Sequence, residues 1–276
     1  MPVATEDHLS GRLLYGDDFL PDEIAEWHRQ EENAFLDLMT HAYGVADADG
    51  NYAYEYDALN RAHAVDRLAG QHFPHCVALG CASGDDVRIL APLVDRFTAI
   101  EPAETFWRPE IGGRPSTYIK PSVTGDLPLQ SESADLATAF GVLHHIPNVS
   151  HVVGEIGRVL KPGGLFLVRE PISWMGDWRR PRPGLTANER GVPVGQFERI
   201  AASAGFEIVS RRYCMFAPLA ALMPKLGFNY PFTKPAFVAL DRAVSAAFSW
   251  NVHYRRDSIA KKFAASSAFW ILRRSE

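Results

Sequence analysis

The chain has 276 residues, of which 47% are hydrophobic and 22% are charged, and its formal net charge is −5. This length and apolar content suffice for one large domain, or for one domain with an elaborate lid. The slightly acidic balance, with a pI near 6.1, argues against a nucleic-acid-binding protein, which usually presents a strongly basic face.

The cellular compartment is predicted from three absences in the sequence. No window reaches about 18 uninterrupted apolar residues, so a membrane-spanning helix is not expected. Residues 1–10 carry acidic and polar side chains and no apolar core, which argues against a secretory signal. Cys76, Cys81 and Cys214 are too few and too scattered for a disulfide framework. We therefore expect a cytoplasmic protein.

Residues 1–70 are predicted to form a helical lid region. A helix is expected from Pro21 to about His41, because apolar side chains recur near one face and proline suits a first helical turn. A second helix is expected from Ala58 to Ala69. Three tyrosines that can close over a ligand stand just before the second helix: Tyr52, Tyr54 and Tyr56.

Residues 71–213 are predicted to form an α/β core. Short apolar runs alternate there with helical patterns, which is typical of βαβ units and a mostly parallel sheet. Helices are expected from Val149 to Leu160 and from Val194 to Ala204. The candidate strands are Cys76–Leu79, Phe97–Glu101, Thr117–Lys120, Leu136–Phe140, Leu165–Glu170 and Glu207–Arg212.

Residues 214–265 are apolar and interrupted by four prolines, which predicts a helical insertion or cap. Such a cap can cover a hydrophobic acceptor or touch a membrane surface, although apolar helical stripes more often belong to a core or a dimer interface. A last strand, Ser267–Leu272, is expected within residues 266–276.

A glycine-bearing turn is the first segment that indicates a ligand. It is Val77-Ala-Leu-Gly-Cys-Ala-Ser-Gly-Asp85, a strand that runs into a turn. Gly80 and Gly84 permit close approach of a ligand to the backbone. A helix expected just beyond would add free N–H groups and a positive dipole end. A tight strand-to-helix turn also needs glycine for structural reasons alone.

Two acidic residues follow at strand ends. Glu101 stands about 20 residues after the glycine turn, where a carboxylate can accept hydrogen bonds from ribose hydroxyls. Asp126, within Gly125-Asp-Leu-Pro-Leu129, can accept one from the amino group of adenine, with Leu127 against the ring. Solvated carboxylates are the alternative interpretation of both acids.

These elements, followed by Phe140-Gly-Val-Leu-His-His-Ile146 and Leu160-Lys-Pro-Gly-Gly164, occur in an order that resembles the class I S-adenosylmethionine-dependent methyltransferases of the small-molecule and lipid type. The resemblance covers about residues 74–212. It implies a Rossmann-like sheet of seven strands, with an antiparallel last strand inserted beside the sixth. It also implies S-adenosylmethionine as the cofactor. The residues expected to contact it are Gly80, Cys81, Ala82, Gly84, Glu101, Pro102, Asp126, Leu127, Phe140 and Gly141.

The sequence departs from the family pattern at one position. The family commonly has an acid two residues before the first glycine, and this chain has Ala78. The loss can weaken cofactor binding, or water and a lid residue can replace the acid. It keeps open the alternative of a protein that binds the cofactor without transferring a methyl group, such as a partner subunit. A nicotinamide dehydrogenase fits less well, because the turn lacks the usual third-position glycine.

His144 and His145 are the candidate general bases, because imidazole titrates near neutrality and the resemblance places both near the methyl group. A structural role competes with this interpretation. Glu170, at the end of the fifth strand, is a second candidate base. No metal site is predicted, because no cysteine or acid cluster at ligand spacing joins the histidines.

The acceptor is predicted to bind near Trp174-Met-Gly-Asp-Trp-Arg-Arg-Pro-Arg182, where aromatic residues beside arginines suit a ring that carries phosphate or carboxylate. A solvated basic loop is the alternative. The run Asn188-Glu-Arg-Gly-Val-Pro-Val-Gly-Gln-Phe197 resembles methyltransferases of glycan biosynthesis. We expect O- or N-methylation of a small acceptor such as a sugar or glycan precursor. A natural-product or lipid acceptor, peripheral membrane contact and a homodimer stay open. The predicted acceptor-binding residues are Tyr54, Tyr56, Glu170, Trp174, Arg179 and Arg190.

Overall fold

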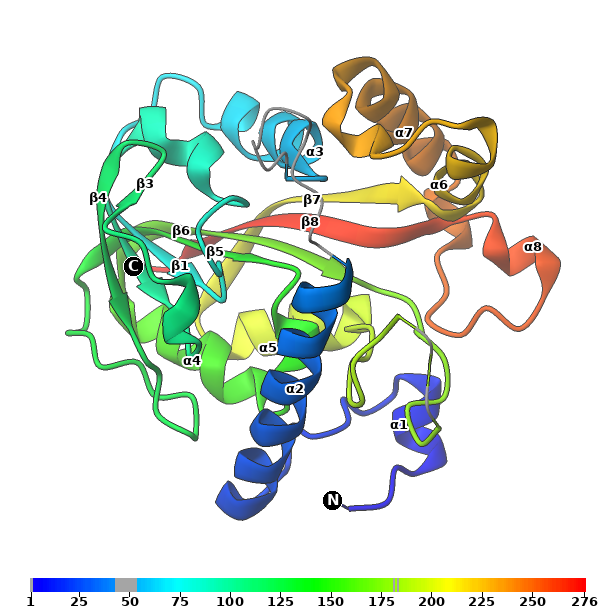
Figure 1. Cartoon of the computed structure of the whole chain (residues 1–276), viewed down its shortest axis with the longest axis horizontal. Helices are drawn as coiled ribbons and strands as arrows, with labels where there is room; N and C mark the ends of the chain where they lie inside the picture. The colour runs from blue at the N-terminus through cyan, green and yellow to red at the C-terminus, as the bar shows by residue number, and fades with distance from the viewer. Residues whose placement is uncertain (1, 43–53, 181, 183) are drawn as a thin grey trace.

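A central sheet of eight strands organises the protein (Figure 1). The computed structural model describes residues 2–42, 54–180, 182 and 184–276. The strand order in the sheet is β3-β4-β2-β1-β5-β6-β8-β7. The strands are β1 (Phe73–Leu79), β2 (Val94–Ile100), β3 (Glu110–Ile111), β4 (Arg114–Ile119), β5 (Ala134–Phe140), β6 (Leu160–Pro171), β7 (Phe206–Phe216) and β8 (Ala265–Arg274).

The strand directions agree with the predicted sheet, and the strand number differs by one. β4, β2, β1, β5 and β6 run parallel, and β8 lies antiparallel between β6 and β7. All seven predicted strands are present, and the last of them lies beside the sixth, as predicted. The eighth strand, β3, is two residues long and pairs only with β4, which is too short to give an alternating pattern in sequence.

The sheet buries both faces, as its continuous apolar runs require. Successive side chains of a strand point to opposite faces. In β1, Val77 and Leu79 belong to one core cluster, whereas Cys76 and Ala78 belong to the other. Helices α4 (Val149–Val159) and α5 (Val194–Ser203) pack on the first cluster, on the opposite side of the sheet from α3 (Figure 1).

The second face is covered mainly by short elements, which corrects two of the predictions. Helix α3 (Asp57–His63) is followed by a 3-10 turn, Val65–Arg67, so the helix expected from Ala58 to Ala69 ends early. After the glycine turn comes a 3-10 helix, Arg88–Leu93, in place of the expected α-helix. Pro92 lies inside this segment and cannot donate an α-helical hydrogen bond. The helix expected beside the turn is therefore a short 3-10 segment.

The Lys161-Pro-Gly-Gly turn lies inside β6. Pairing with β5 slips from Ala134–Leu160 to Leu136–Leu165, so the residues between bulge out of the ladder. Gly163, with φ +76°, allows the bend.

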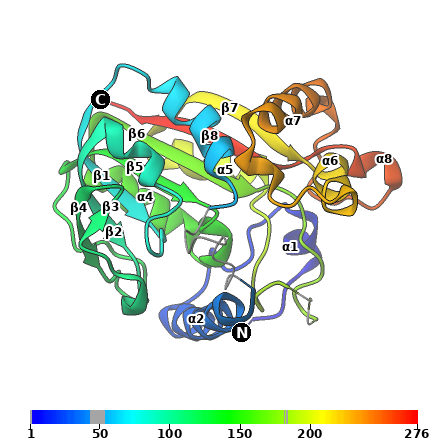
Figure 2. The same cartoon turned by 45° about the horizontal axis from the view of Figure 1, so that its top comes forward.

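The N-terminal region docks on the core through aromatic residues. Helices α1 (Glu6–Ser10) and α2 (Pro21–Ala42) lie away from α7 in both views (Figures 1 and 2). Trp27 of α2 is fully buried, and its indole N–H donates to the His145 carbonyl oxygen at 2.6 Å. Because of this contact, α2 lies directly beside the segment that follows β5.

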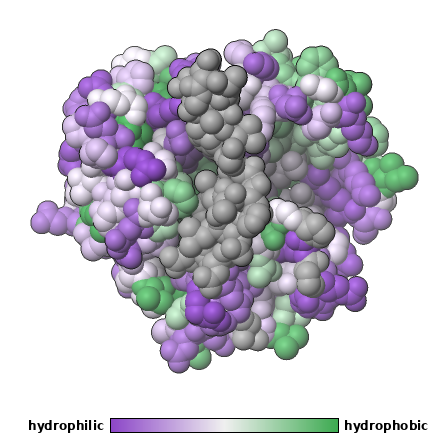
Figure 3. Space-filling model, in the orientation of Figure 1, coloured by the Kyte–Doolittle hydropathy of each residue, from purple (hydrophilic) through white to green (hydrophobic). Residues whose placement is uncertain are grey.

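Residues between β7 and β8 form helices α6 (Ala217–Leu222), α7 (Pro235–Ala247) and α8 (Ile259–Lys262). Asp241 of α7 is buried, and its carboxylate accepts the N–H groups of Met215 and Phe216 at 2.9 and 2.7 Å. Apolar side chains are exposed over this part of the surface (Figure 3). None of the described helices is long and apolar enough to span a membrane.

Candidate active site

The predicted site residues meet at one edge of the sheet because neighbouring parallel strands end there. The carboxyl ends of β2, β1, β5 and β6 are adjacent in the strand order. The glycine turn, Glu101 and the segment 141–145 follow β1, β2 and β5, and Glu170 is the last residue but one of β6. Ligands of open α/β sheets bind at this kind of edge.

The glycines of the turn are needed for packing. A Cβ on Gly80 would meet Val142 Cγ1 at 2.5 Å, and a Cβ on Gly84 would meet Ile111 Cγ1 at 2.6 Å. Both backbones have positive φ, at +57° and +85°. The structural explanation of these glycines therefore holds, and a ligand role for them rests on the other residues of the site.

Ala82 adopts a left-handed conformation, with φ +44°, in the middle of the same turn. This conformation is unfavourable for a residue with a Cβ, by roughly 1–2 kcal/mol. Two hydrogen bonds hold it: the Ala82 N–H donates to Glu101 Oε2 at 3.0 Å, and the Tyr118 hydroxyl donates to the Ala82 carbonyl at 2.9 Å.

Glu101 connects the glycine turn with the segment after β2. Its side chain is buried, and its other oxygen, Oε1, accepts the N–H of Ala103 at 3.0 Å. The carboxylate is thus fixed at the strand end where the sequence predicts a ribose contact.

Asp126 is an exposed and ionised hydrogen-bond acceptor. Its carboxylate accepts hydrogen bonds from Thr124 at 2.6 Å, Ser122 at 2.8 Å and His151 Nε2 at 2.9 Å. These hydrogen bonds lower the pKa of Asp126 to about 2. The next side chain, Leu127, is buried, and its N–H donates to Glu155 at 2.9 Å.

Asp86 is a buried acid that the sequence analysis missed. Its side chain is 7% exposed, and Oδ1 accepts no hydrogen bond from any described residue. Burial raises the pKa of Asp86 to about 8, against the opposing effect of the Arg169 charge. A pair of acids in a turn suggests two solvated side chains, and only the fold shows that the second is enclosed.

Arg169 lies close to Asp86 and links β6 to the lid. Asn60 of α3 bridges the two, because its Oδ1 accepts from Arg169 Nε at 3.0 Å and its Nδ2 donates to the Asp86 carbonyl at 3.4 Å. The Arg169 guanidinium also donates to the Tyr54 hydroxyl at 2.8 Å and lies 4.4 Å from the centre of the Tyr56 ring. Arg169 is a charged residue within the apolar run of β6, and this position in the sequence indicates a buried polar network.

The two predicted lid tyrosines that the structure describes therefore contact Arg169, and Tyr52 lies outside the described residues. Burial raises the pKa of the Tyr54 and Tyr56 hydroxyls. These hydroxyls stay protonated at neutral pH, so they act as hydrogen-bonding groups.

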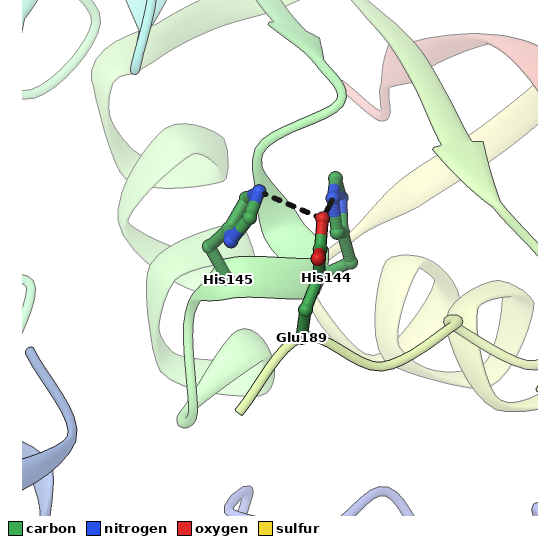
Figure 4. Close-up of side chains that lie close together, drawn as sticks. All are labelled: His144, His145 and Glu189. Carbon is green, nitrogen blue, oxygen red and sulfur yellow. Dashed lines mark hydrogen bonds and ion pairs between the residues drawn. The ribbon is translucent and has the colours of Figure 1, made fainter. Parts of the chain in front are cut away.

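The two histidines after β5 both lie beside Glu189 (Figure 4), and each contacts one further carboxylate. His144 Nδ1 is 2.7 Å from Glu170 Oε2, and its Nε2 is 3.3 Å from Glu189 Oε1. His145 Nδ1 is 2.8 Å from Glu31 Oε2, and its Nε2 is 3.6 Å from the same Glu189 oxygen. Glu189 follows β6 at a separation of 45 residues from His144, and sequence spacing gave no signal of it.

His144 is poorly suited to the predicted role of general base. Burial alone would lower its pKa, but hydrogen bonds to Glu170 and Glu189 outweigh burial and raise the pKa to about 9. Both ring nitrogens are engaged, and the side chain is only 8% exposed. His145 is 26% exposed and stays the better candidate for contact with an acceptor.

Glu170 is corrected from an acceptor contact to a residue that fixes the turn after β5. It is fully buried, and one of its oxygens, Oε1, accepts the N–H groups of Val142 and Leu143, both at 2.8 Å.

The arginine loop also differs from the prediction. Arg190 is fully buried and donates to the carbonyls of His144 at 3.1 Å, Ile146 at 2.9 Å and Pro147 at 3.0 Å, so it binds the protein's own backbone and not an acceptor. Arg179 is exposed and pairs with Asp177.

Trp174 also pairs within the protein: the Arg255 guanidinium lies 5.2 Å from its ring centre. Trp174, Arg179 and Arg190 thus each contact other groups of the protein.

Comparisons with known proteins place these features in a family context. Residues 77–168, from β1 to β6, match a family described as a methyltransferase domain. A sterol 4-C-methyltransferase of Caenorhabditis elegans is 31% identical over 167 residues, which is 51% of this chain and 49% of the relative. A 27-O-demethylrifamycin SV methyltransferase of Amycolatopsis mediterranei is 24% identical over 68% of this chain and 74% of the relative.

The chain spans between 49% and 62% of the length of three of the curated relatives that it matches. Among solved structures, the [4+2]-cyclase SpnF is similar with a TM-score of 0.57 over 93% of this chain and 97% of that chain. At 17% identity this likeness concerns the fold.

Proposed function

We propose, because this chain belongs to the class I S-adenosylmethionine-dependent methyltransferases, that it transfers a methyl group from S-adenosylmethionine to an oxygen or nitrogen of a small-molecule acceptor. The observation that carries the proposal is that the glycine turn, Glu101 and Asp126 follow the neighbouring strands β1, β2 and β4, and that the turn donates a hydrogen bond to Glu101. The matched family segment contains all three.

The described residues fit the nucleoside part of this cofactor. Asp126 offers an ionised, exposed acceptor for the amino group of adenine, beside the apolar Leu127. Glu101 is held at the strand end by two backbone N–H groups, and we assign its carboxylate to the ribose hydroxyls. Contacts from Cys81, Pro102, Phe140 and Gly141 stay predictions.

The methionine part of the cofactor carries an ammonium and a carboxylate, and the site offers a buried acid, Asp86, and a buried guanidinium, Arg169. We assign the ammonium to Asp86, whose Oδ1 has no partner among the described residues, and the carboxylate to Arg169. Asp86 would then replace the acid that is missing at Ala78. An ammonium beside it would also remove the unfavourable burial of a lone carboxylate.

When bound, the cofactor supplies a methyl group that is already electrophilic on its sulfonium. The protein's own contribution is to align the acceptor and exclude water. His145 lies at the carboxyl end of β5 and is the more exposed of the two histidines, so we propose that it faces the acceptor. Its carbonyl and imidazole are held by Trp27 and Glu31 of α2.

We propose a sugar or glycan precursor as the acceptor, on the similarity of residues 188–197 to glycan-biosynthesis enzymes. A natural-product or lipid acceptor is the second candidate. It is supported by the exposed apolar side chains between β7 and β8 and by relatives whose names refer to a sterol and a rifamycin. A cytoplasmic location, peripheral membrane contact and a homodimer stay predictions.

The test combines cofactor binding with acceptor screening. Asp86→Asn should weaken S-adenosylmethionine binding about 10-fold or more, because a hydrogen bond to a charged group contributes roughly 1.5–3 kcal/mol. Asp85→Asn is the matched control, because Asp85 is the adjacent acid and its side chain is 36% exposed. Release of S-adenosylhomocysteine with sugars, phosphosugars or lipids then identifies the acceptor class.

A second function, cofactor binding without methyl transfer, is favoured by Ala78 and by the strained Ala82 in the turn. A protein of similar fold, SpnF, is a [4+2]-cyclase. Tight cofactor binding without S-adenosylhomocysteine release across all acceptor classes would select this alternative.

A further inference from the structure

The two histidines of the candidate site direct the same ring nitrogen toward one carboxylate (Figure 4). His144 Nε2 and His145 Nε2 lie 3.3 and 3.6 Å from Glu189 Oε1. Their Nδ1 atoms are each bound to another carboxylate, Glu170 and Glu31 respectively. Because a carboxylate accepts hydrogen bonds and an ionised one donates none, each Nδ1 carries a proton.

The two imidazoles lie close together, with their ring centres 4.0 Å apart. Ligand atoms of both rings and of Glu189 come within 4.8 Å of one another. All three groups can therefore bind one divalent cation.

The distances are compatible with a metal ion shared by the three groups. Zinc–nitrogen and zinc–oxygen bonds of about 2.0–2.2 Å at a tetrahedral angle place neighbouring ligand atoms about 3.4 Å apart. The two observed separations, 3.3 and 3.6 Å, lie on either side of this value. A separation of 3.6 Å is too long for a hydrogen bond.

The groups behind the ligands are fixed as in established metal sites. A metal-bound histidine usually donates its other N–H to a carboxylate, which orients the ring. Glu170 is itself held by the Val142 and Leu143 N–H groups.

Glu31, the carboxylate that accepts from His145 Nδ1, is held by the Thr186 hydroxyl at 2.6 Å and the Asn188 N–H at 2.8 Å. The other carboxylate oxygen of Glu189, Oε2, accepts the Thr186 N–H at 3.1 Å.

We propose that His144 Nε2, His145 Nε2 and Glu189 bind a divalent transition-metal ion such as Zn²⁺. Two imidazoles and one carboxylate suit such ions, whereas Mg²⁺ and Ca²⁺ prefer oxygen ligands. Three protein ligands leave a coordination position for water or another oxygen. This site reverses the sequence-based expectation of no metal, which rested on the lack of an acid near the histidines. It also assigns His145 to the metal in place of proton transfer.

The test is metal titration of the full chain after removal of bound ions with a chelator. Calorimetry with Zn²⁺ should give one equivalent bound with release of protons, since the metal displaces them from the ligands. Co²⁺ should give visible absorption bands that Zn²⁺ abolishes. Glu189→Gln should abolish both signals, and Glu31→Gln should weaken the affinity about 10–100-fold. His72→Gln, on an exposed pair with Asp95, is the control and should bind as the parent does.

The same samples are titrated with S-adenosylmethionine, which keeps the two proposals separate. Cofactor binding by a folded parent protein that takes up neither Zn²⁺ nor Co²⁺ would overturn the metal site and leave the proposed function intact. Equal Co²⁺ spectra for the parent and Glu189→Gln would also overturn it. Stoichiometric metal binding without cofactor binding would support the metal site and count against the methyltransferase function.

Discussion

The two halves of the candidate site are built in different ways. On the cofactor side, the glycine turn, Glu101 and Asp126 follow successive strands, and each is positioned by residues close to it in sequence or in the sheet. On the histidine side, the residues come from α2, the turn after β5, the end of β6 and the loop at 186–190. Site residues that lie in short local segments can therefore be recognised in the sequence, whereas a cluster assembled from distant segments cannot.

The largest expected effect comes from Glu170, which holds the histidine side together. Glu170→Ala should destabilise the protein by about 3–5 kcal/mol, because it breaks a buried ion pair and leaves two backbone N–H groups without an acceptor. Urea unfolding measures this loss. Glu207→Ala, on an exposed position of β7, should stay within about 0.5 kcal/mol of the parent. A similarly small change for Glu170→Ala would mean that the cluster does not stabilise the fold.

Asp86, on the cofactor side, is expected to make the free energy of unfolding depend on pH. Its folded pKa, about 8, lies above its ordinary value of 3.8, so the folded state binds the proton more tightly than the unfolded state. Its contribution to stability is therefore fully present below pH 4 and is lost as the pH rises toward 8, by at most about 1.4 kcal/mol per pH unit. Urea midpoints of the parent and Asp86→Asn at pH 5 and pH 8 measure it. Asp86→Asn should gain stability relative to the parent as the pH rises, and parallel pH profiles would contradict the assignment.

A smaller effect, on cofactor affinity, is expected from substitution of Glu101, the residue predicted to bind the ribose. Glu101→Ala should weaken S-adenosylmethionine binding by about 1–3 kcal/mol, the range for a lost hydrogen bond with a charged group. Calorimetry compares it with Glu110→Ala, an exposed acid of β3 that pairs with Pro115 near the start of β4, away from the end of β2. Unchanged affinity in a folded Glu101→Ala variant would remove the ribose assignment.

The smallest effect concerns the strained turn. Ala82→Gly should stabilise the protein by about 0.5–1 kcal/mol, because relief of the left-handed strain exceeds the entropy that glycine adds to the unfolded chain. Ala202→Gly, exposed in α5, should instead destabilise by a similar amount. If thermal unfolding shows both variants to be destabilised, the conformation at Ala82 is not strained.

Most of the fold follows from local patterns in the sequence. The seven longer strands and the helices α4 and α5 are long apolar segments whose periodicity is visible. β3 was missed because two residues carry no periodicity. The prediction of an α-helix after the glycine turn was wrong, because Pro92 lies inside this segment and cannot donate an α-helical hydrogen bond.

The sequence predicts the candidate site only where the role of a residue does not depend on distant partners. Glu101 follows from its spacing, but the burial of Asp86 depends on Asn60 and Arg169, which lie 26 and more residues away. Glu31 lies 114 residues from His145, so no spacing rule could pair them. Arg190 was misplaced because an arginine in a loop usually points to solvent, whereas this one fills the space under Trp27.

The most direct test of the central claim is calorimetric titration of the purified full chain with S-adenosylmethionine and S-adenosylhomocysteine. The account predicts micromolar binding of both at one equivalent per chain, with the affinity for S-adenosylmethionine reduced in Asp86→Asn and kept in Asp85→Asn. A folded protein that binds neither ligand would contradict it.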